Sequence, residues 1–281
     1  MAYKRIIIDG PYLAHRSQSS PYHLTTSTGL DSTLIHGFLR SLRSIKNRFT
    51  EEPSLMSPGY TPKLIITWES HGTPSWRRQQ LPTYKPTSLE NDDQYISQVN
   101  DLKLILNYLN LTQYYSPTNE ADDVIASLLF NNPIPTLIYT TDKDIHQLIS
   151  NSRNHHIFSN KEIIFEEDVL VKFGIRPTQI PDYLGLVGDK SDNIKGVFGV
   201  GPVKASTLLN NYQTIEEIPI SAFKRPSDKA LALFNKKLTL LNKTCDLLPI
   251  SDKTDVSLID LLRKYELNSI IKQIESYKKL A

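Results

Sequence analysis

The sequence lacks the cysteines of disulfide-stabilised proteins and the long apolar runs of membrane proteins. Cys245 is the single cysteine among 281 residues, which excludes an internal disulfide and favours a reducing compartment. Near the start of the chain three isoleucines are interrupted by Asp9, so no signal peptide is expected. No apolar run approaches the roughly 20 residues of a membrane span. We therefore expect a soluble intracellular protein, with chain enough for one large domain or two modest ones.

The sequence also lacks a clear excess of positive or negative residues. The formal net charge is +2, from 32 Lys and Arg against 30 Asp and Glu. This balance becomes informative only if many of the acids gather in one place, because the rest of the surface must then be basic.

Three short β-branched runs predict buried strands that end on an acid. They span residues 4–10, 63–69 and 135–142. Between them, apolar residues recur at helical spacing over residues 34–45, 96–109 and 121–130. Strands alternating with helices predict an α/β fold with a largely parallel central sheet flanked by helices. Such sheets place their active sites outside the carboxyl ends of the strands, where this sequence has its acids.

The rest of the chain contains segments of other kinds. The stretch from Ser70 to Gln94 is polar and holds three prolines, as long functional or disordered excursions do. A hairpin is predicted around Ser159 and Asn160. Five of the eleven glycines fall between residues 185 and 201, which marks a specialised loop. From Ser221 onward the pattern predicts lysine-rich helix that ends in residues 258–280.

Nine carboxylates follow strands or form clusters: Asp9, Glu69, Glu120, Asp122, Asp123, Asp142, Asp144, Asp189 and Asp192. Each group has an ordinary interpretation when taken alone. The acids at 120–123 can cap the following helix, although capping explains one or two of them, not three in four positions. Those at 142 and 144 fit a solvated loop, and those at 189 and 192 fit a turn. Taken together, the nine predict one acidic site.

Repulsion in such a site raises carboxylate pKa values, and hard divalent cations relieve it. Mg²⁺ is the usual ion for a few carboxylates plus water, and nine carboxylates are too many for one octahedral ion. Pairs of ions roughly 3.5–4 Å apart are the usual solution for phosphodiester hydrolysis. Without the nine acids the formal charge of +2 becomes +11, which is typical of a protein that binds a polyanion.

The cations gather in the excursion, beside the glycine loop and after it. They are Arg77, Arg78 and Lys85, interleaved with Trp76 and Tyr84; then Lys190, Lys195 and Lys204; then Lys224, Arg225, Lys229, Lys236, Lys237 and Lys243. For the last group a solvated face is the simpler interpretation.

The glycine loop over residues 196–204 is not a nucleotide-binding loop. It lacks the Gly-Lys-Ser/Thr ending of a P-loop and does not follow a strand as a dinucleotide loop does. Gly196, Gly199 and Gly201 instead suit a helix–hairpin–helix turn. In such a turn the backbone approaches a DNA phosphate, which binds duplex without reading its sequence.

The chain resembles the 5′-nuclease (flap endonuclease) family, which includes standalone bacteriophage 5′–3′ exonucleases and the N-terminal nuclease domain of bacterial DNA polymerase I. Three motifs carry the resemblance, which extends from Ile6 to about Lys243: Glu120-Ala-Asp-Asp123, Thr141-Asp-Lys-Asp144 and the run from Gly188 to Gly201. It implies a PIN-like nuclease core in residues 1–172, with a helical arch over about residues 70–110. Residues 173–281 are implied to form a helix–three-turn–helix element and a C-terminal helical region.

The resemblance also implies roles for the residues that match its motifs. Asp9, Glu69, Glu120 and Asp122, supported by Asp123, would serve a first Mg²⁺, and Asp142, Asp144, Asp189 and Asp192 a second, with Mn²⁺ as a substitute. Arg16 would contact the substrate near the scissile phosphate, Arg77 would clamp a phosphate and Lys85 would act as an electrostatic catalyst. The implied DNA-binding residues are Trp76, Tyr84, Lys190, Lys195, Gly196, Gly199, Gly201 and Lys204, and the glycine turn would hold K⁺ through backbone carbonyls.

The chain departs from the family's pattern in three places. Glu69 stands where the family usually has Asp, which lengthens a metal ligand by one methylene. Ser88 stands where an arginine commonly follows the arch lysine, and Pro86 directly follows that lysine. His15 replaces an aromatic residue before Arg16. Ordering of the arch and threading of a flap therefore follow less directly from the sequence than metal binding does.

These implications predict a Mg²⁺-dependent, structure-specific 5′–3′ exonuclease and flap endonuclease of DNA replication or repair. It would act on 5′ ends and flaps of branched or duplex DNA, with RNA primers in RNA/DNA hybrids as further candidates. We expect a monomer in the cytoplasm of a bacterium or a phage-infected host cell. Because 281 residues hold no polymerase domain, any coupling to a replicative polymerase is expected in trans.

The sequence argues against two other classes of protein. A non-catalytic binder of branched DNA with a relic nuclease fold gains nothing from nine negative charges near phosphate. An aspartyl-nucleophile phosphatase needs a second Asp two positions after Asp9, where this chain has Pro11. The sequence does not set the balance of exonuclease and flap endonuclease activity, or the preference for RNA or DNA ends.

Overall fold

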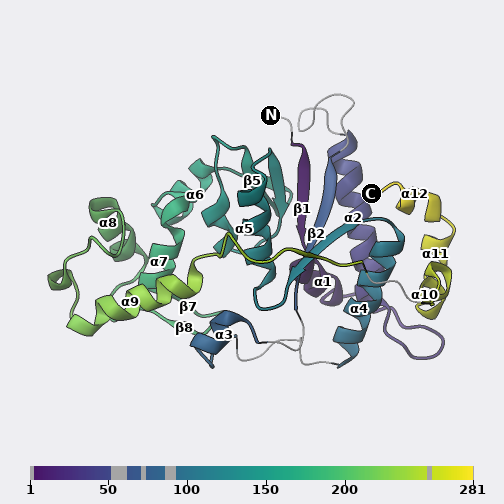
Figure 1. Cartoon of the computed structure of the whole chain (residues 1–281), viewed down its shortest axis with the longest axis horizontal. Helices are drawn as coiled ribbons and strands as arrows, with labels where there is room; N and C mark the ends of the chain where they lie inside the picture. Colours follow the sequence, from purple (N-terminus) through teal and green to yellow (C-terminus); the bar gives the residue numbers. More distant parts are fainter. Residues whose placement is uncertain (1–2, 52–61, 71–73, 86–92, 252–254, 281) are drawn as a thin grey trace.

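The computed structural model describes residues 3–51, 62–70, 74–85, 93–251 and 255–280 (Figure 1). Among these residues no helix is both long enough and apolar enough to cross a membrane. The sequence departures at Pro86 and Ser88 lie outside the described residues.

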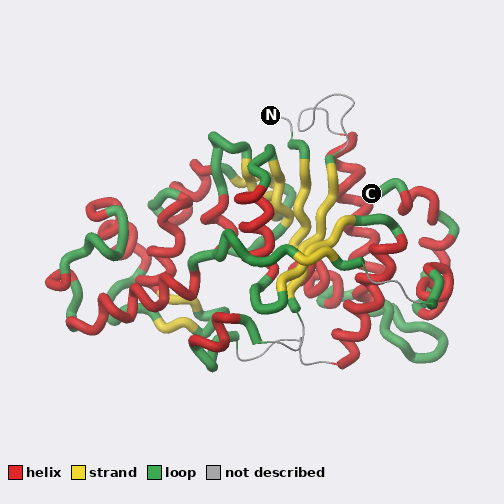
Figure 2. Tube along the Cα trace, in the orientation of Figure 1, coloured by secondary structure: helices red, strands yellow, loops and turns green. Residues whose placement is uncertain are grey.

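A seven-stranded sheet forms the centre of the molecule in the order β6-β5-β4-β1-β2-β3-β9 (Figure 2). Its strands are β1 (Arg5–Asp9), β2 (Lys63–Glu69), β3 (Thr112–Ser116), β4 (Thr136–Tyr139), β5 (His155–Ser159), β6 (Glu162–Ile164) and β9 (Leu248–Pro249). Strands β1 to β5 run parallel, and β6 and β9 are antiparallel edge strands. The predicted α/β fold with a largely parallel sheet is confirmed.

Helices cover both faces of this sheet, which explains the unbroken apolar run of β1. Ile6 and Ile8 point into a core shared with α1 (Gly10–Gln18), α2 (Thr33–Glu51) and α4 (Asp93–Tyr108). Ile7 points to the opposite face, into a core shared with α5 (Ala121–Asn131). Because alternate side chains are buried on both faces, the three positions between Arg5 and Asp9 are all apolar. The helices predicted over 34–45, 96–109 and 121–130 are therefore confirmed.

The remaining elements lie towards the two ends of the molecule (Figure 1). The helices are α3 (Trp76–Gln80), α6 (Glu166–Phe173), α7 (Ile180–Val187), α8 (Pro202–Tyr212), α9 (Pro226–Thr239), α10 (Leu258–Lys264), α11 (Asn268–Ile271) and α12 (Ile274–Lys278). A small antiparallel pair, β7 (Gly188–Asp189) and β8 (Ile194–Lys195), lies between α7 and α8. Helices α10 to α12 pack on the core of α2 and α4.

Three local predictions had different outcomes. The hairpin is confirmed, because β5 and β6 are joined by Asn160 and Lys161, both with positive φ. The strand predicted to reach Asp142 ends at Tyr139, so Asp142 lies in a loop. The helix predicted over 258–280 is instead three short helices, and Glu266 between the first two has a φ of 50° that no continuous helix allows.

Candidate active site

Asp9 lies where β1 passes directly into α1. Its carboxylate accepts a hydrogen bond from the Tyr12 amide at 3.0 Å and thereby caps α1. Thr140, which follows β4, donates to its other oxygen at 2.7 Å. A Cβ on Gly10 would lie 2.5 Å from the Thr67 carbonyl oxygen, so only glycine fits where the chain turns. Asp9 is therefore held firmly at the carboxyl end of the central strand.

The carboxyl edge of the sheet carries a cleft of about 520 Å³ lined by acids. They come from the ends of β1 and β2, the start of α5, the loop after β4 and the loop between β7 and β8. The acids are Asp9, Glu69, Glu120, Asp122, Asp142 and Asp192, and the other lining residues include Tyr12, His15 and Lys85. Six of the nine predicted acids thus converge, although up to 183 positions separate them in the sequence.

Two further acids join this site through Asp192. Carboxylate oxygens of Asp144, Asp189 and Asp192 lie within 4.8 Å of one another. Asp144 begins a short 3₁₀ helix (Asp144–Leu148), and its buried Oδ1 has no hydrogen-bond partner among the described residues. A buried oxygen without a donor is costly unless a cation approaches it.

Burial and mutual repulsion shift the titration of these acids. Burial raises the pKa of Asp9 to about 6, and repulsion from Asp142 adds to that effect. The pKa values of Asp122 and Asp144 are held well above the usual range by burial and then by the charge of Asp142. The site therefore concentrates more negative charge than the protein alone neutralises.

Tyr84 and Lys85 supply donors to the same carboxylates. The Tyr84 hydroxyl lies 3.0 Å from Asp192 Oδ2 and 3.2 Å from Glu120 Oε2, and Lys85 Nζ lies 2.8 Å from Glu120 Oε2. Burial would raise the pKa of Glu120, but Lys85 and then Arg77 outweigh it and bring the value to about 2. Tyr84 is only 3% exposed, so its ring is buried and not presented to DNA, contrary to the DNA-binding role implied for it.

Arg77 is not placed to clamp a substrate phosphate, which corrects the role expected for it. Its guanidinium is buried and makes a bidentate ion pair with Asp123 at 2.6 and 2.9 Å, and it also donates to the Leu238 carbonyl at 2.7 Å. Asp123 is fully buried and accepts the Asn242 amide as well. Both of its oxygens are thus occupied away from the cleft, so the structure shows Asp123 as a structural partner rather than a metal ligand.

Arg16 is exposed on α1, and its guanidinium bonds the Tyr139 hydroxyl. His15, one residue earlier, stacks on Tyr95 with ring centroids 5.0 Å apart and lines the cleft. Arg16 therefore lies on the helix that Asp9 caps, one residue after a residue that lines the cleft.

The sequence did not single out Ser75, Thr140, Lys143 or Ser191 as residues of the site. Ser75 donates to Glu120 at 3.0 Å, and Lys143 lies 2.6 Å from Asp189 and 2.9 Å from Ser191. Thr140 supports Asp9, as described above. The position of Lys143 between Asp142 and Asp144 was the one available signal, because a loop that places both acids in a site also places the residue between them.

The glycine turn joins α7 to α8. Gly188 has a φ of 81°, and a Cβ on Gly196 would lie 2.1 Å from the Val187 carbonyl oxygen, so the β7–β8 pair closes tightly on the end of α7. Pro202 then opens α8, as the sequence indicated. Lys190, Lys195, Gly199 and Gly201 are exposed, and Lys204 is partly buried with Nζ 3.4 Å from the Ala222 carbonyl.

Phe198 at the tip of this turn is 60% exposed, and Lys224 Nζ and the Arg225 guanidinium lie 4.9 and 5.4 Å from its ring centre. These two cations thus belong to the turn. Lys236 differs, because it pairs with Asp182 and Glu216 and serves the packing of α9 on α7.

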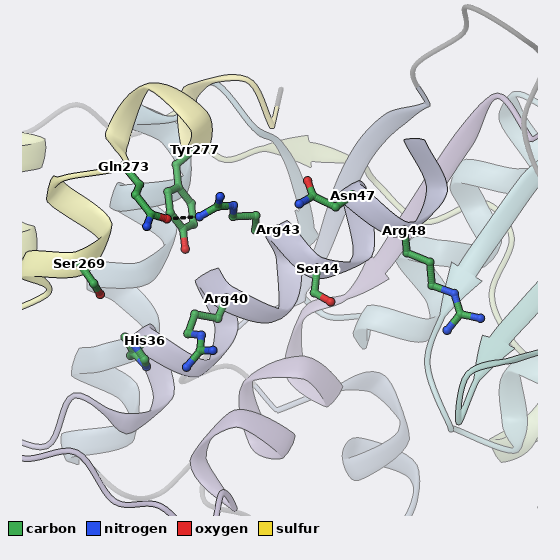
Figure 3. Close-up of a pocket in the computed structure, with 9 residues that line it drawn as sticks. All are labelled: His36, Arg40, Arg43, Ser44, Asn47, Arg48, Ser269, Gln273 and Tyr277. Carbon is green, nitrogen blue, oxygen red and sulfur yellow. Dashed lines mark hydrogen bonds between the residues drawn. The ribbon is translucent and has the colours of Figure 1, made fainter. Parts of the chain in front are cut away.

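A cavity of about 730 Å³ lies apart from the acidic cleft, between α2 and the C-terminal helices (Figure 3). Arg40, Arg43 and Arg48 line it together with His36. Arg43 bonds Gln273 and lies over the Tyr277 ring. None of the predicted site residues lines this cavity.

Solved structures of other proteins share this fold. The T5 D15 protein co-crystallised with metal ions superposes with a TM-score of 0.64 at 16% identity, covering 98% of both chains. The catalytic core of Rad2 in complex with DNA substrate gives a TM-score of 0.58 at 14% identity, covering 100% of this chain and 92% of that one. These likenesses concern the fold.

The family is established by sequence. Residues 4–174 match the model of the 5′-3′ exonuclease N-terminal resolvase-like domain, and residues 175–268 match that of the 5′-3′ exonuclease C-terminal SAM fold. The chain belongs to the 5′-3′ exonuclease family. It is 30% identical to a 5′-3′ exonuclease of Mycoplasmopsis pulmonis, over 97% of this chain and 94% of that protein. A DNA polymerase I of Thermus thermophilus is 31% identical over 76% of this chain but 24% of the polymerase.

Proposed function

We propose that this protein is a Mg²⁺-dependent, structure-specific 5′–3′ exonuclease and flap endonuclease that hydrolyses phosphodiester bonds at 5′ ends and flaps of branched DNA. The observation that carries the proposal is the convergence of acids from five separate segments at one edge of the sheet, beside Lys85. Family membership supports the reaction class. RNA primers, a role in replication or repair, and a polymerase acting in trans are parts of the same proposal.

The acids fit divalent cations. Carboxylate oxygens suit Mg²⁺ and Mn²⁺, and the partnerless Asp144 oxygen and raised pKa values mark a site that needs positive charge. Asp9, Glu69, Glu120 and Asp122 would hold a first ion, and Asp142, Asp144, Asp189 and Asp192 a second. Such ions, when bound, acidify an attacking water and stabilise charge on the phosphoryl oxygens.

The chain's own residues complete the chemistry. Lys85 Nζ, partly exposed at the wall of the cleft, is available to a phosphoryl oxygen, where a fixed positive charge lowers the barrier. Tyr84 and Ser75 orient Glu120, and Thr140 orients Asp9. Arg16, exposed on α1, would contact the strand near the scissile phosphate. Arg77 and Asp123 hold α3 against α5 and the end of α9.

The glycine turn would bind the downstream duplex. Gly196, Gly199, Gly201, Lys190, Lys195 and Lys204, with the cations around Phe198, offer backbone amides and positive charge to phosphates. K⁺ held by backbone carbonyls of this turn is part of the proposal. The division into a nuclease core over 1–172 and a DNA-binding region over 173–281 follows from this assignment, and we propose that the protein acts as a monomer.

An assay on a 5′-flap duplex in Mg²⁺ tests the proposal. The wild-type chain should release the flap, and Asp142→Asn combined with Asp144→Asn should abolish release. Undiminished cleavage by the double variant would remove the second-ion assignment. Binding of branched DNA by the wild-type chain without cleavage in Mg²⁺ or Mn²⁺ would favour a non-catalytic binder.

A further inference from the structure

A groove of about 570 Å³ adjoins the catalytic cleft at the base of α3. Thr118 and Asn119 line the groove, while Glu120 and the next two residues line the cleft. Ser75 likewise bonds Glu120, and its neighbour Trp76 lines the groove. Residues that are adjacent in the chain thus line the groove and the cleft, so the two hollows are neighbours.

The chemistry of the groove is aromatic, cationic and free of acids. Its described lining comprises Trp76, Thr118, Asn119, Lys237, Leu240, Leu241, Asn242, Lys243 and Thr244. Leu240 is 44% exposed, so part of its apolar side chain is open to the groove. Among the described residues neither lysine forms an ion pair, and Lys237 Nζ donates to Gln80 Oε1 at 3.4 Å. The carboxylates line the cleft, and none of them lines the groove.

We propose that this groove binds the single-stranded 5′ arm of the substrate, on the side of the scissile phosphate away from the duplex. The inference rests on the proposed function and adds a second contact for the same substrate. The flat faces of bases stack on aromatic or aliphatic side chains. The phosphates of the nucleic-acid backbone pair with lysines. Trp76 and Leu240 supply the first kind of surface, and Lys237 and Lys243 supply the second.

The local structure holds Trp76 in place for this contact. Its backbone amide donates to the Thr118 carbonyl at 2.9 Å, and the Arg77 guanidinium lies 4.6 Å from its ring centre. Asn242 donates to Asn119 at 3.1 Å and closes the floor of the groove. The platform is thus built from the same segments that carry Glu120 and Asp123, so a strand leaving the cleft meets it directly.

Tryptophan fluorescence can measure this contact, because the chain has two tryptophans. Trp68 is 1% exposed and bonded to Gln113, which leaves Trp76 as the reporter. The experiment uses the full chain carrying Asp142→Asn and Asp144→Asn, so that the substrate stays intact. A duplex with a 5′ single-stranded arm is titrated against the same duplex without the arm, and the ratio of the two Kd values is the measured quantity.

We expect the arm to quench the fluorescence and to tighten binding by roughly five- to 100-fold, as one or two stacked bases do. Trp76→Ala should bring the Kd ratio towards one. Trp76→Phe should keep most of the ratio while losing the quenching. Lys237→Ala with Lys243→Ala should reduce the ratio without touching the aromatic ring, which keeps the test decisive if Trp76→Ala fails to fold.

Several results would overturn the groove while leaving the nuclease intact. They are a wild-type chain that cleaves flaps but gives a Kd ratio of one, equal quenching by the armless duplex, or a ratio unchanged in the lysine variant. Equal displacement of the arm by a polyglutamate peptide would instead assign the groove to an acidic peptide. Failure of the proposed function would look different, as absence of cleavage by the wild-type chain.

Discussion

The buried hydroxyl of Tyr84 lies 3.0 Å from Oδ2 of Asp192, a residue 108 positions later in the sequence. The same hydroxyl lies 3.2 Å from Glu120. One side chain therefore connects the two groups of acids. Burial raises the pKa of Tyr84 well above its usual range, so the hydroxyl stays protonated at neutral pH and remains a donor.

Tyr84→Phe should lower the free energy of unfolding by about 1–3 kcal/mol when divalent cations are chelated, because buried carboxylates lose a donor. The loss should be smaller in Mg²⁺, which supplies the missing positive charge. Urea denaturation in chelator and in Mg²⁺ measures both values. Tyr22→Phe, at an exposed tyrosine, is the matched control. Equal stability of the variant and the wild-type chain would show that the hydroxyl contributes nothing.

Lys85→Ala should lower kcat on a 5′-flap duplex by about 10²- to 10³-fold with a much smaller change in substrate affinity, because a charge fixed beside the reacting phosphate acts mainly in the transition state. Single-turnover kinetics and a binding titration separate the two effects. Lys190→Ala, at an exposed lysine of the glycine turn, should show the reverse pattern. A Lys85→Ala enzyme of normal turnover would refute the catalytic role.

Arg77→Met should destabilise the protein by about 3–5 kcal/mol, because Asp123 is then left buried without its cation. Arg77→Lys should lose less, since it keeps the charge but not the bidentate geometry. Denaturant unfolding measures both variants. If Arg77 were a phosphate clamp, stability would be unchanged and DNA affinity would fall.

The buried His155 predicts a fall in stability at acidic pH. Burial and the positive charge of Arg5 lower its pKa to about 4 from a usual value of 6.5. Between pH 6.5 and about pH 4, His155 is therefore protonated in the unfolded chain and neutral in the folded chain. The free energy of unfolding is therefore unaffected by this group above pH 6.5 and falls as the pH drops towards 4. His155→Gln should remove up to about 3 kcal/mol of this pH dependence.

Thermal unfolding from pH 7 to pH 4 measures the effect, with His23→Gln as the control at an exposed histidine. Parallel curves for His155→Gln and the wild-type chain would contradict the prediction.

Removal of divalent cations should lower the melting temperature, because ions that bind the folded acids and not the unfolded chain stabilise the fold by mass action. Asp144→Asn should weaken this response, since Asp144 Oδ1 is the buried oxygen that lacks a donor. Melting curves against Mg²⁺ concentration test it. A response in the variant as large as in the wild-type chain would exclude Asp144 as a ligand.

Local sequence was sufficient where a strand is buried on both faces. The strands β1 and β2 each contain a run of three apolar residues and end on an acid, so the sequence predicted both the strands and the position of their acids. Strand β3 escaped notice because its sequence, Thr-Gln-Tyr-Tyr-Ser, is polar and half-buried. Its buried Gln113 is explained by the Trp68 indole, a contact across two strands that no local pattern contains. The two-residue β9 left no pattern at all.

The acids of the cleft followed from motif and strand order, but the direction of individual side chains did not. Arg77 and Asp123 lie 46 positions apart, and their pairing depends on how α3 packs against α5. A cation beside aromatic residues looks the same in sequence whether it faces a phosphate or a buried carboxylate. The break at Glu266 was equally hidden, because no glycine or proline marks it.

The antiparallel pairing of β9 with β3 brings the chain back from α9, near one end of the molecule, to the far edge of the sheet. The last helices then cover α2 and α4, so the C-terminal region packs against N-terminal elements and does not form a separate unit. Cutting the chain before Leu248 would remove β9 and α10 to α12. The backbone of β3 and the apolar side chains of α2 and α4 would then be exposed, which would make the edge of the sheet prone to self-association.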